Sequence, residues 1–204
     1  LASELAYSDF ITRVLPQNEF FGAQVREQLI YYPTVTREPF RNTGRITHVA
    51  NLPAGAEVVG PVNGACPGEM YVDALGMQPH TPARAMTEAD IAHAVAEYAE
   101  AARLAIEAGF DGVELHAANG YLIEQFLNAN VNTRTDGYGG STAGRNRFAL
   151  EVARATVAAI GAERVGIRLS PYGVFNGTGA FADVDAQYLA LVQELSTLGL
   201  MYLH

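Results

Sequence analysis

The order of helices and strands in this chain predicts an α/β fold, a parallel sheet covered by helices, and favours a (β/α)8 barrel over an open doubly wound sheet. From residue 87 onward, segments with helical and strand-like patterns alternate and only short turns separate them. Apolar residues make up 49% of the 204 residues, enough for a sizeable core. No strand-like segment is followed directly by GxGxxG, the fingerprint of a dinucleotide-binding open sheet.

The first regular element is a helix that begins after Thr87. Thr87 and Asp90 form an approximate capping box, and apolar residues then recur at helical spacing. Gly109 is expected just beyond the end of this helix, where a left-handed residue closes many helices. The apolar positions are Ile91, Val95, Tyr98, Ala102, Ala105 and Ile106.

The remaining elements alternate strand and helix to the end of the chain. In order, they are a strand over 110–116, a short helix over 121–127, a helix over 147–160, a strand over 165–170, a helix over 185–198 and a strand over 200–203. Residues 47–86 differ, because proline and glycine recur there every few residues, which predicts an excursion that contains a hairpin. Residues 1–46 contain an expected helix followed by the strand-like IYYPTVT.

Charge and cysteine content restrict the expected partners. The formal net charge is −9, and a negative surface repels nucleic acid and anionic membranes, so neither is expected as a partner. A single cysteine, Cys66, excludes an internal disulfide, and no Cys/His cluster has zinc spacing. These features predict a cytoplasmic protein without a metal site. The two ends, LASELAYSDF and LGLMYLH, indicate a fragment of a longer chain.

Three polar side chains follow one another where the strand at 110–116 ends: His116, Asn119 and Tyr121. In both candidate folds ligands bind at the C-terminal ends of the strands. His116 and Asn119 could donate hydrogen bonds to one carbonyl or nitro oxygen, while Tyr121 supplies a proton as a general acid. The alternative is structural, with a core histidine, an Asn-Gly turn and a tyrosine that packs its ring. The residues alone leave both interpretations open.

Arg168 is a cation inside the apolar strand at 165–170, where an unpaired charge would be costly. It either pairs with an acid of the neighbouring strand, such as Glu114, or contacts an anionic ligand or the electron-rich edge of a cofactor. The ligand contact is favoured. In the glycine-rich loop that follows the short helix, Arg134 and Asp136 are expected to bond to each other and hold the loop rigid.

Several long motifs occur in one order along the chain, namely GRITHV, GEMYVDALGMQ, TPARAMTEADI, GFDGVELHAANGYLIEQFLNANVNTRTDGYGGS, RFALEV and VGIRLSPYGVFN. Together they resemble the Old Yellow Enzyme family of FMN-dependent NAD(P)H oxidoreductases, or ene-reductases, over about residues 44–204. The resemblance implies a (β/α)8 TIM barrel that holds FMN at its C-terminal mouth. Because only the middle strands of that barrel are matched, the expected fold is α/β, a partial (β/α)8 TIM barrel.

The resemblance also implies roles for individual residues. His116 and Asn119 match the family's His-x-x-Asn pair, which binds the oxygen of the acceptor, and Tyr121 matches its proton donor. Arg168 matches the residue that contacts the pyrimidine edge of FMN. The implied reaction is reduction of FMN by NADPH or NADH, followed by hydride transfer to an activated alkene such as an enone, or to a nitro compound. Ala143 and Gly144 depart from the Glu and Asn that the family usually has.

Residues 1–46 resemble part of the NADP-binding domain of bacterial ferredoxin–NADP reductases. Arg37 and Arg45 match the ligands of the adenosine 2′-phosphate in that domain, and a guanidinium suits a phosphate well; otherwise both are solvated arginines. The expected domains are therefore a reductase-like segment, 1–46, and a partial barrel, 47–204. The alternative function is an NADP-binding segment fused to an inactive partial barrel, a non-catalytic fragment or chimera whose open strand edges favour association.

Overall fold

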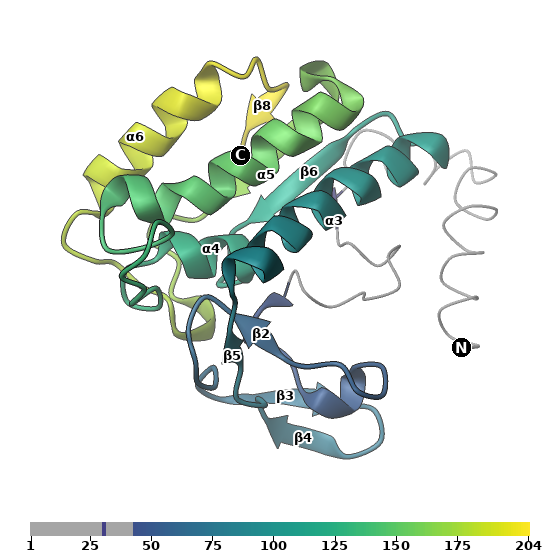
Figure 1. Ribbon diagram of the computed structural model, residues 1–204, viewed down its shortest axis with the longest axis vertical. Coiled ribbons are helices and arrows are strands. Elements are labelled where there is room, and N and C mark those ends of the chain that lie inside the picture. Colours follow the sequence, from purple (N-terminus) through teal and green to yellow (C-terminus); the bar gives the residue numbers. More distant parts are fainter. Residues whose placement is uncertain (1–29, 32–42) are drawn as a thin grey trace.

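The computed structural model describes residues 30–31 and 43–204, and Figure 1 shows their arrangement. The reductase-like segment predicted for residues 1–46 therefore lies mostly outside the described residues, as does Arg37. Within the described residues no helix combines the length and apolarity needed to cross a membrane. The same residues contain no group of three or more His, Cys, Asp or Glu side chains that could hold a metal ion.

In the part of the chain that the structure describes, the central sheet has four parallel strands. In sheet order they are β1 (Ile30–Tyr31), β6 (Val113–Ala117), β7 (Val165–Leu169) and β8 (Tyr202–Leu203). The predicted strands at 110–116, 165–170 and 200–203 are thus present. The first begins later than predicted because the Phe110 N–H donates to Ala105 O at 3.1 Å, which makes Phe110 part of the preceding helix end.

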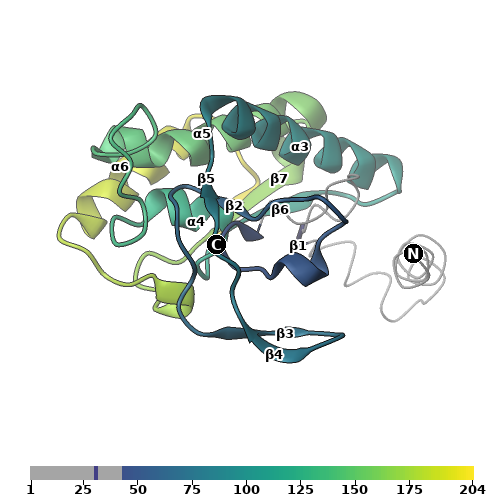
Figure 2. The ribbon, with the colours of Figure 1, turned by 60° about the horizontal axis from the view of Figure 1, so that its bottom comes forward.

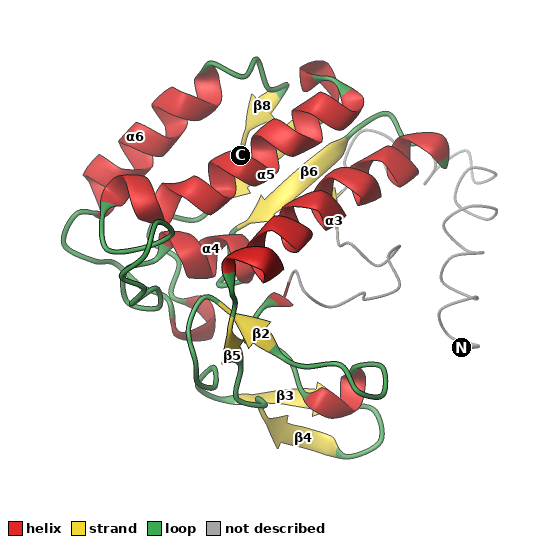
Figure 3. Ribbon diagram, viewed as in Figure 1, coloured by secondary structure: helices red, strands yellow, loops and turns green. Residues whose placement is uncertain are grey.

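Among the described residues, four α-helices connect and cover these strands (Figures 1 and 3). They are α3 (Glu88–Glu107), α4 (Leu122–Leu127), α5 (Thr142–Ile160) and α6 (Val184–Ser196). Figure 2 shows α3, α5 and α6 on one side of the sheet, which is the layer order of a (β/α) barrel wall. The predicted alternation of strand and helix is therefore confirmed.

Local sequence signals account for the ends of the two long helices. Thr87 Oγ1 accepts from the Asp90 N–H at 3.1 Å and Asp90 Oδ2 accepts from the Thr87 N–H at 2.8 Å, so the predicted capping box closes the start of α3. Gly109 follows α3 with φ +94°, as expected. Helix α5 begins at Thr142 rather than at 147, because Ser141 Oγ caps the Gly144 N–H at 3.1 Å.

The core lies between the sheet and the helices. Leu115 from β6 and Ile167 from β7 are fully buried, and they belong to one apolar cluster with Phe126, Phe148 and Leu191 from three helices. The rings of Phe126 and Phe148 lie 4.4 Å apart between centroids. Burial of a side chain of this size stabilises by roughly 1.5–3 kcal/mol. This packing holds β6 and β7, and thus the residues at their ends, in one position relative to each other.

Residues 47–86 form the predicted excursion, and residues 43–46 lead into it. It contains η4 (Val49–Asn51), the parallel pair β2 (Val59–Gly60) and β5 (Arg84–Ala85), and the antiparallel hairpin β3 (Glu69–Val72) and β4 (Gly76–Pro79). Figure 2 shows the hairpin on the side of the molecule away from α3 and α5. The hairpin prediction is confirmed. Two further 3-10 turns, η5 (Ala162–Arg164) and η6 (Phe175–Gly177), flank β7.

Arg134 ties this excursion to the barrel wall. Its Nε and Nη2 atoms donate to the Asp136 carboxylate at 3.0 and 2.5 Å, as predicted. Its Nη1 atom donates at 2.7 Å to two backbone carbonyl oxygens of the excursion and its exit, Pro61 O and Met86 O. A guanidinium has enough donors for all four bonds. The loop that carries Arg134 is therefore rigid because it joins two parts of the fold.

Candidate active site

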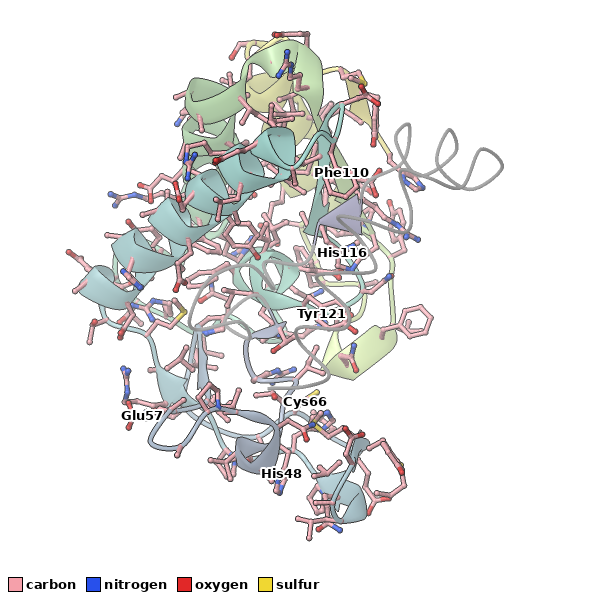
Figure 4. All side chains as sticks on the ribbon, turned by 90° about the vertical axis from the view of Figure 1, so that its right-hand side faces the viewer. His48, Glu57, Cys66, Phe110, His116 and Tyr121 are labelled. Carbon is pink, nitrogen blue, oxygen red and sulfur yellow. The ribbon has the colours of Figure 1, made fainter. Side chains whose placement is uncertain are left out.

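The C-terminal ends of β6 and β7 bring together the four residues for which barrel chemistry was predicted. His116 and Arg168 lie opposite each other in the register of β6 and β7. Asn119 and Tyr121 lie in the turn between β6 and α4. In Figure 4 His116 and Tyr121 lie close together, with Phe110 towards the other end of β6. The two adjacent strands and the turn after β6 thus place an imidazole, a carboxamide, a phenol and a guanidinium at one edge of the sheet.

His116 is held neutral by its surroundings. His116 is buried, with only 5% of its surface exposed. Burial lowers the pKa of His116 below its ordinary value of 6.5, the charge of Arg168 lowers it further, and Glu114 partly opposes both. A neutral imidazole keeps one ring N–H donor at neutral pH. His116 can therefore donate a hydrogen bond to a ligand oxygen without carrying a charge.

Asn119 has an unusual backbone conformation, with φ +57°. Its N–H donates to Ser170 Oγ at 2.9 Å, and its carbonyl oxygen accepts from Asn176 Nδ2 at 2.7 Å. Gly120 continues the turn with φ +78°. Asn and Gly are the residues that most readily adopt this region, and the two residues form a turn here. The turn and the proposed site coexist, because the backbone makes the turn and the Asn119 side chain is not used in it.

Tyr121 occupies the N-cap position of α4 and is half-buried. Its ring centroid lies 5.2 Å from that of His116, with the two rings tilted by 54°. This separation is within the range of favourable aromatic contacts. The phenol of Tyr121 and the imidazole of His116 are therefore neighbours across one small region at the end of β6.

Arg168 is half-buried on β7. The structural alternative considered for it was an ion pair with Glu114, but the ion pair that Glu114 makes among the described residues is with His204. Glu114 Oε2 instead lies 3.0 Å from His204 Nδ1. Burial is the main cause of the lowered pKa of His116, and the positive charge of the nearby Arg168 lowers it further. A guanidinium at this position suits the carbonyl and nitrogen edge of a heterocycle such as a flavin.

Arg45 is the described member of the predicted 2′-phosphate pair. Its guanidinium Nη2 donates to Asn176 O at 3.1 Å, and its backbone N–H donates to Gln125 Oε1 at 3.1 Å. Burial lowers the pKa of Arg45. Because Arg37 lies outside the described residues, the phosphate-binding role of the pair stays a prediction.

Three residues that support this site were not predicted: Glu124, Ser170 and Asn176. Glu124 lies within the apolar run LIEQFL of α4 and is fully buried. An acidic residue inside such an apolar run could have been recognised from the sequence, because a buried carboxylate needs hydrogen-bond partners. Ser170 and Asn176 carry no comparable signal, since both residue types are common in loops.

Comparisons with known proteins identify the family to which the chain belongs. The model of the NADH:flavin oxidoreductase / NADH oxidase family matches residues 39–203. The chain belongs to this family. The aldehyde reductase FrzD of Cladobotryum sp is 57% identical over 120 residues, which cover 59% of this chain and 32% of that protein. A probable flavin mononucleotide-dependent alkene reductase of Leishmania infantum is 47% identical over 152 residues, which cover 72% of this chain and 41% of that protein.

Solved structures show the same relationship. The Old Yellow Enzyme homologue of Zymomonas mobilis superimposes with a TM-score of 0.74 at 36% identity, covering 79% of this chain and 44% of that one. Morphinone reductase in complex with tetrahydroNAD gives 0.74 at 40% identity, covering 79% and 46%. The Old Yellow Enzyme resemblance and the partial-barrel fold are thereby confirmed. The chain spans from about a third to under half the length of these relatives.

Membership of the family also supports the cofactor prediction. FMN is the cofactor of this family of oxidoreductases, and NADH or NADPH is its reductant. The side chains at the ends of β6 and β7 are compatible with it, because a half-buried guanidinium and a neutral imidazole lie on adjacent strands at the edge where a ligand of a barrel binds. The ferredoxin–NADP reductase resemblance of residues 1–46 stays a prediction.

Proposed function

We propose that this chain carries the substrate-binding and proton-donating part of the active site of an FMN-dependent NAD(P)H oxidoreductase that reduces activated alkenes. The observation that carries the proposal is the buried, neutral His116, which faces Arg168 across the sheet and Tyr121 at 5.2 Å. Substrates of this class, enones and nitro compounds, present a polar oxygen conjugated to an alkene. They need a hydrogen-bond donor at that oxygen and a proton source at the α-carbon.

Each residue has a distinct part in the proposed reaction. His116 and Asn119 donate hydrogen bonds to the substrate oxygen and withdraw electron density from the alkene. Tyr121 holds a phenolic proton beside them and delivers it to the α-carbon. Arg168 would hold the flavin ring of FMN, and its fixed positive charge would favour negative charge there. FMN, when bound and reduced by NADPH or NADH, supplies the hydride for the β-carbon.

The first test is whether the purified chain binds FMN. We expect the fluorescence of FMN to be quenched on titration with the chain, and Arg168→Gln to weaken the apparent affinity. Unquenched fluorescence at saturating protein would refute FMN binding by this chain. It would leave the family membership intact, because that rests on the sequence match.

The second test separates the two half-reactions. Tyr121→Phe should slow alkene reduction by 10²–10⁴-fold, the usual contribution of a general acid, and leave reduction of FMN by NADPH unchanged. Tyr98→Phe is the matched control, because Tyr98 is buried against Phe148 in the helix layer and lies outside the site. An equal loss in both half-reactions for Tyr121→Phe would contradict its role as proton donor.

The alternative function, an NADP-binding segment joined to an inactive barrel, has its own test. It requires NADP, but not NAD, to bind the chain and requires Arg37→Ala to abolish that binding, since the 2′-phosphate alone distinguishes the two nucleotides. Arg45→Ala is the less specific variant, because it also removes the hydrogen bond to Asn176 O. Equal binding of NADP and NAD would exclude the predicted 2′-phosphate site.

A further inference from the structure

We infer that Ser170, together with Glu124 and Asn176, positions Asn119 for substrate binding. The inference rests on the proposed function and deepens it, because it names residues that act on the oxygen-binding pair without touching the substrate. All three lie outside the motif His116-x-x-Asn119. Each is joined to the Asn119-Gly120 turn by a hydrogen bond, directly or through one intermediate.

A directed chain of hydrogen bonds runs from α4 to the turn. Ser170 Oγ donates its proton to Glu124 Oε2 at 2.9 Å and accepts the Asn119 N–H at 2.9 Å. Glu124 Oε2 also accepts the Gly120 N–H at 2.5 Å. Because a hydroxyl has one proton, the bond to Glu124 turns the lone pairs of Ser170 towards Asn119. Glu124 thus orients Ser170, and Ser170 orients Asn119.

Asn176 holds the same residue from the opposite side. Its Nδ2 atom donates to Asn119 O at 2.7 Å. Asn176 is itself fixed, since its backbone oxygen accepts from Arg45 Nη2 at 3.1 Å and from Cys66 Sγ at 3.3 Å. Both polar groups of the Asn119 backbone are therefore bonded to residues of the segment that follows β7. The position of Asn119 depends on that segment as much as on β6.

The conformation of Asn119 explains why it needs this support. Asparagine tolerates the left-handed region better than most non-glycine residues, but this region is still less favourable for it than the right-handed one, so the two backbone hydrogen bonds help to hold Asn119 in place. The chain also buries Glu124 completely, with its Oε1 atom unpartnered among the described residues. Burying a carboxyl group in this way is unfavourable. Such local costs are typical of residues that serve a site.

The experiment compares Ser170→Ala with Ser170→Thr in the full chain, with 2-cyclohexen-1-one as the alkene. Ser170→Ala removes the link to Asn119, and we expect KM for the enone to rise about tenfold, the usual effect of one hydrogen bond. The rate of FMN reduction by NADPH should not change. Ser170→Thr retains the hydroxyl and should restore most of the affinity. Ser196→Ala, which removes an exposed hydroxyl bonded to Gln193 O on α6, is the matched control.

A double-mutant cycle distinguishes positioning from general structural damage. If Ser170 acts through Asn119, Ser170→Ala should have no further effect on KM in the Asn119→Ala background. A full additional tenfold loss in that background would overturn the inference. So would an unchanged KM in the single variant.

A measurement that needs no turnover tests the positioning role of Ser170 independently of the proposed function. If the wild-type chain reduces no enone, the proposed function fails, but the hydrogen bond can still be tested by amide exchange. The Asn119 N–H should then exchange at least about tenfold faster in Ser170→Ala than in wild type, while the Gly120 N–H stays protected by Glu124. An unchanged exchange rate at Asn119 would overturn the positioning role.

Discussion

Gly120→Ala is the substitution for which the structure predicts the clearest local cost. Gly120 has φ +78° and lies where the Asn119-Gly120 turn meets the segment after β7. A Cβ atom added at Gly120 would lie 2.6 Å from the Asn176 Cβ atom and 2.8 Å from Phe175 O. Both contacts are too short, and Phe175 O is a backbone atom that cannot rotate away. We therefore expect the turn and the segment after β7 to move apart.

Two effects add up in the loss of unfolding free energy that we expect for Gly120→Ala. The left-handed conformation costs an alanine roughly 1–2 kcal/mol. The collision adds roughly 1–3 kcal/mol, the usual cost of overpacking. Gly109→Ala is the matched control, since Gly109 also has a positive φ, +94°, but a Cβ atom there would meet nothing within 4 Å. The control variant has the backbone cost but not the collision, and the change in entropy of the unfolded chain is the same in both variants.

Urea unfolding followed by circular dichroism measures both variants against wild type. Gly120→Ala should lower the free energy of unfolding by roughly 1–3 kcal/mol more than Gly109→Ala does. It should also raise KM for the enone, because the displaced segment carries Asn176. Equal destabilisation of the two variants would refute the close approach of the turn to the segment after β7.

Two further predictions concern charge. Burial and the charge of Arg168 lower the pKa of His116, so the unfolded chain binds more protons below pH 6.5 and the free energy of unfolding falls as pH decreases through that window. NMR titration should show that Arg168→Gln raises the pKa of His116. An unchanged pKa would contradict the electrostatic effect of Arg168 on this histidine. Hydrogen bonds, chiefly from Arg84, hold the pKa of Asp90 well below its usual 3.8. Asp90→Asn should therefore lower the free energy of unfolding by about 1 kcal/mol at pH 7. In urea unfolding, this difference between the variant and wild type should shrink as the pH falls below 3.8, because Asp90 of wild type then becomes protonated in the unfolded chain. A difference that does not change with pH would contradict the role of the charged carboxylate.

Short-range patterns predicted most of the regular structure. The capping box of Thr87 and Asp90, the closing Gly109 and the alternation of helix and strand all depend on residues within a few positions of one another. The boundaries that moved are those where another segment competes. Strand β6 starts late because Phe110 bonds back to α3, and α5 starts early because Ser141 caps it.

The site divides in the same way. Local sequence places His116, Asn119 and Tyr121 within six positions at the end of one strand, which is the basis of the proposed chemistry. Only the tertiary structure decided that Arg168 faces His116, that Glu114 bonds His204 instead, and which groups hold the Asn119 backbone. Those contacts join residues about 50 or more positions apart. They form only when separate segments of the chain pack together, so no pattern within a few positions along the sequence predicts them.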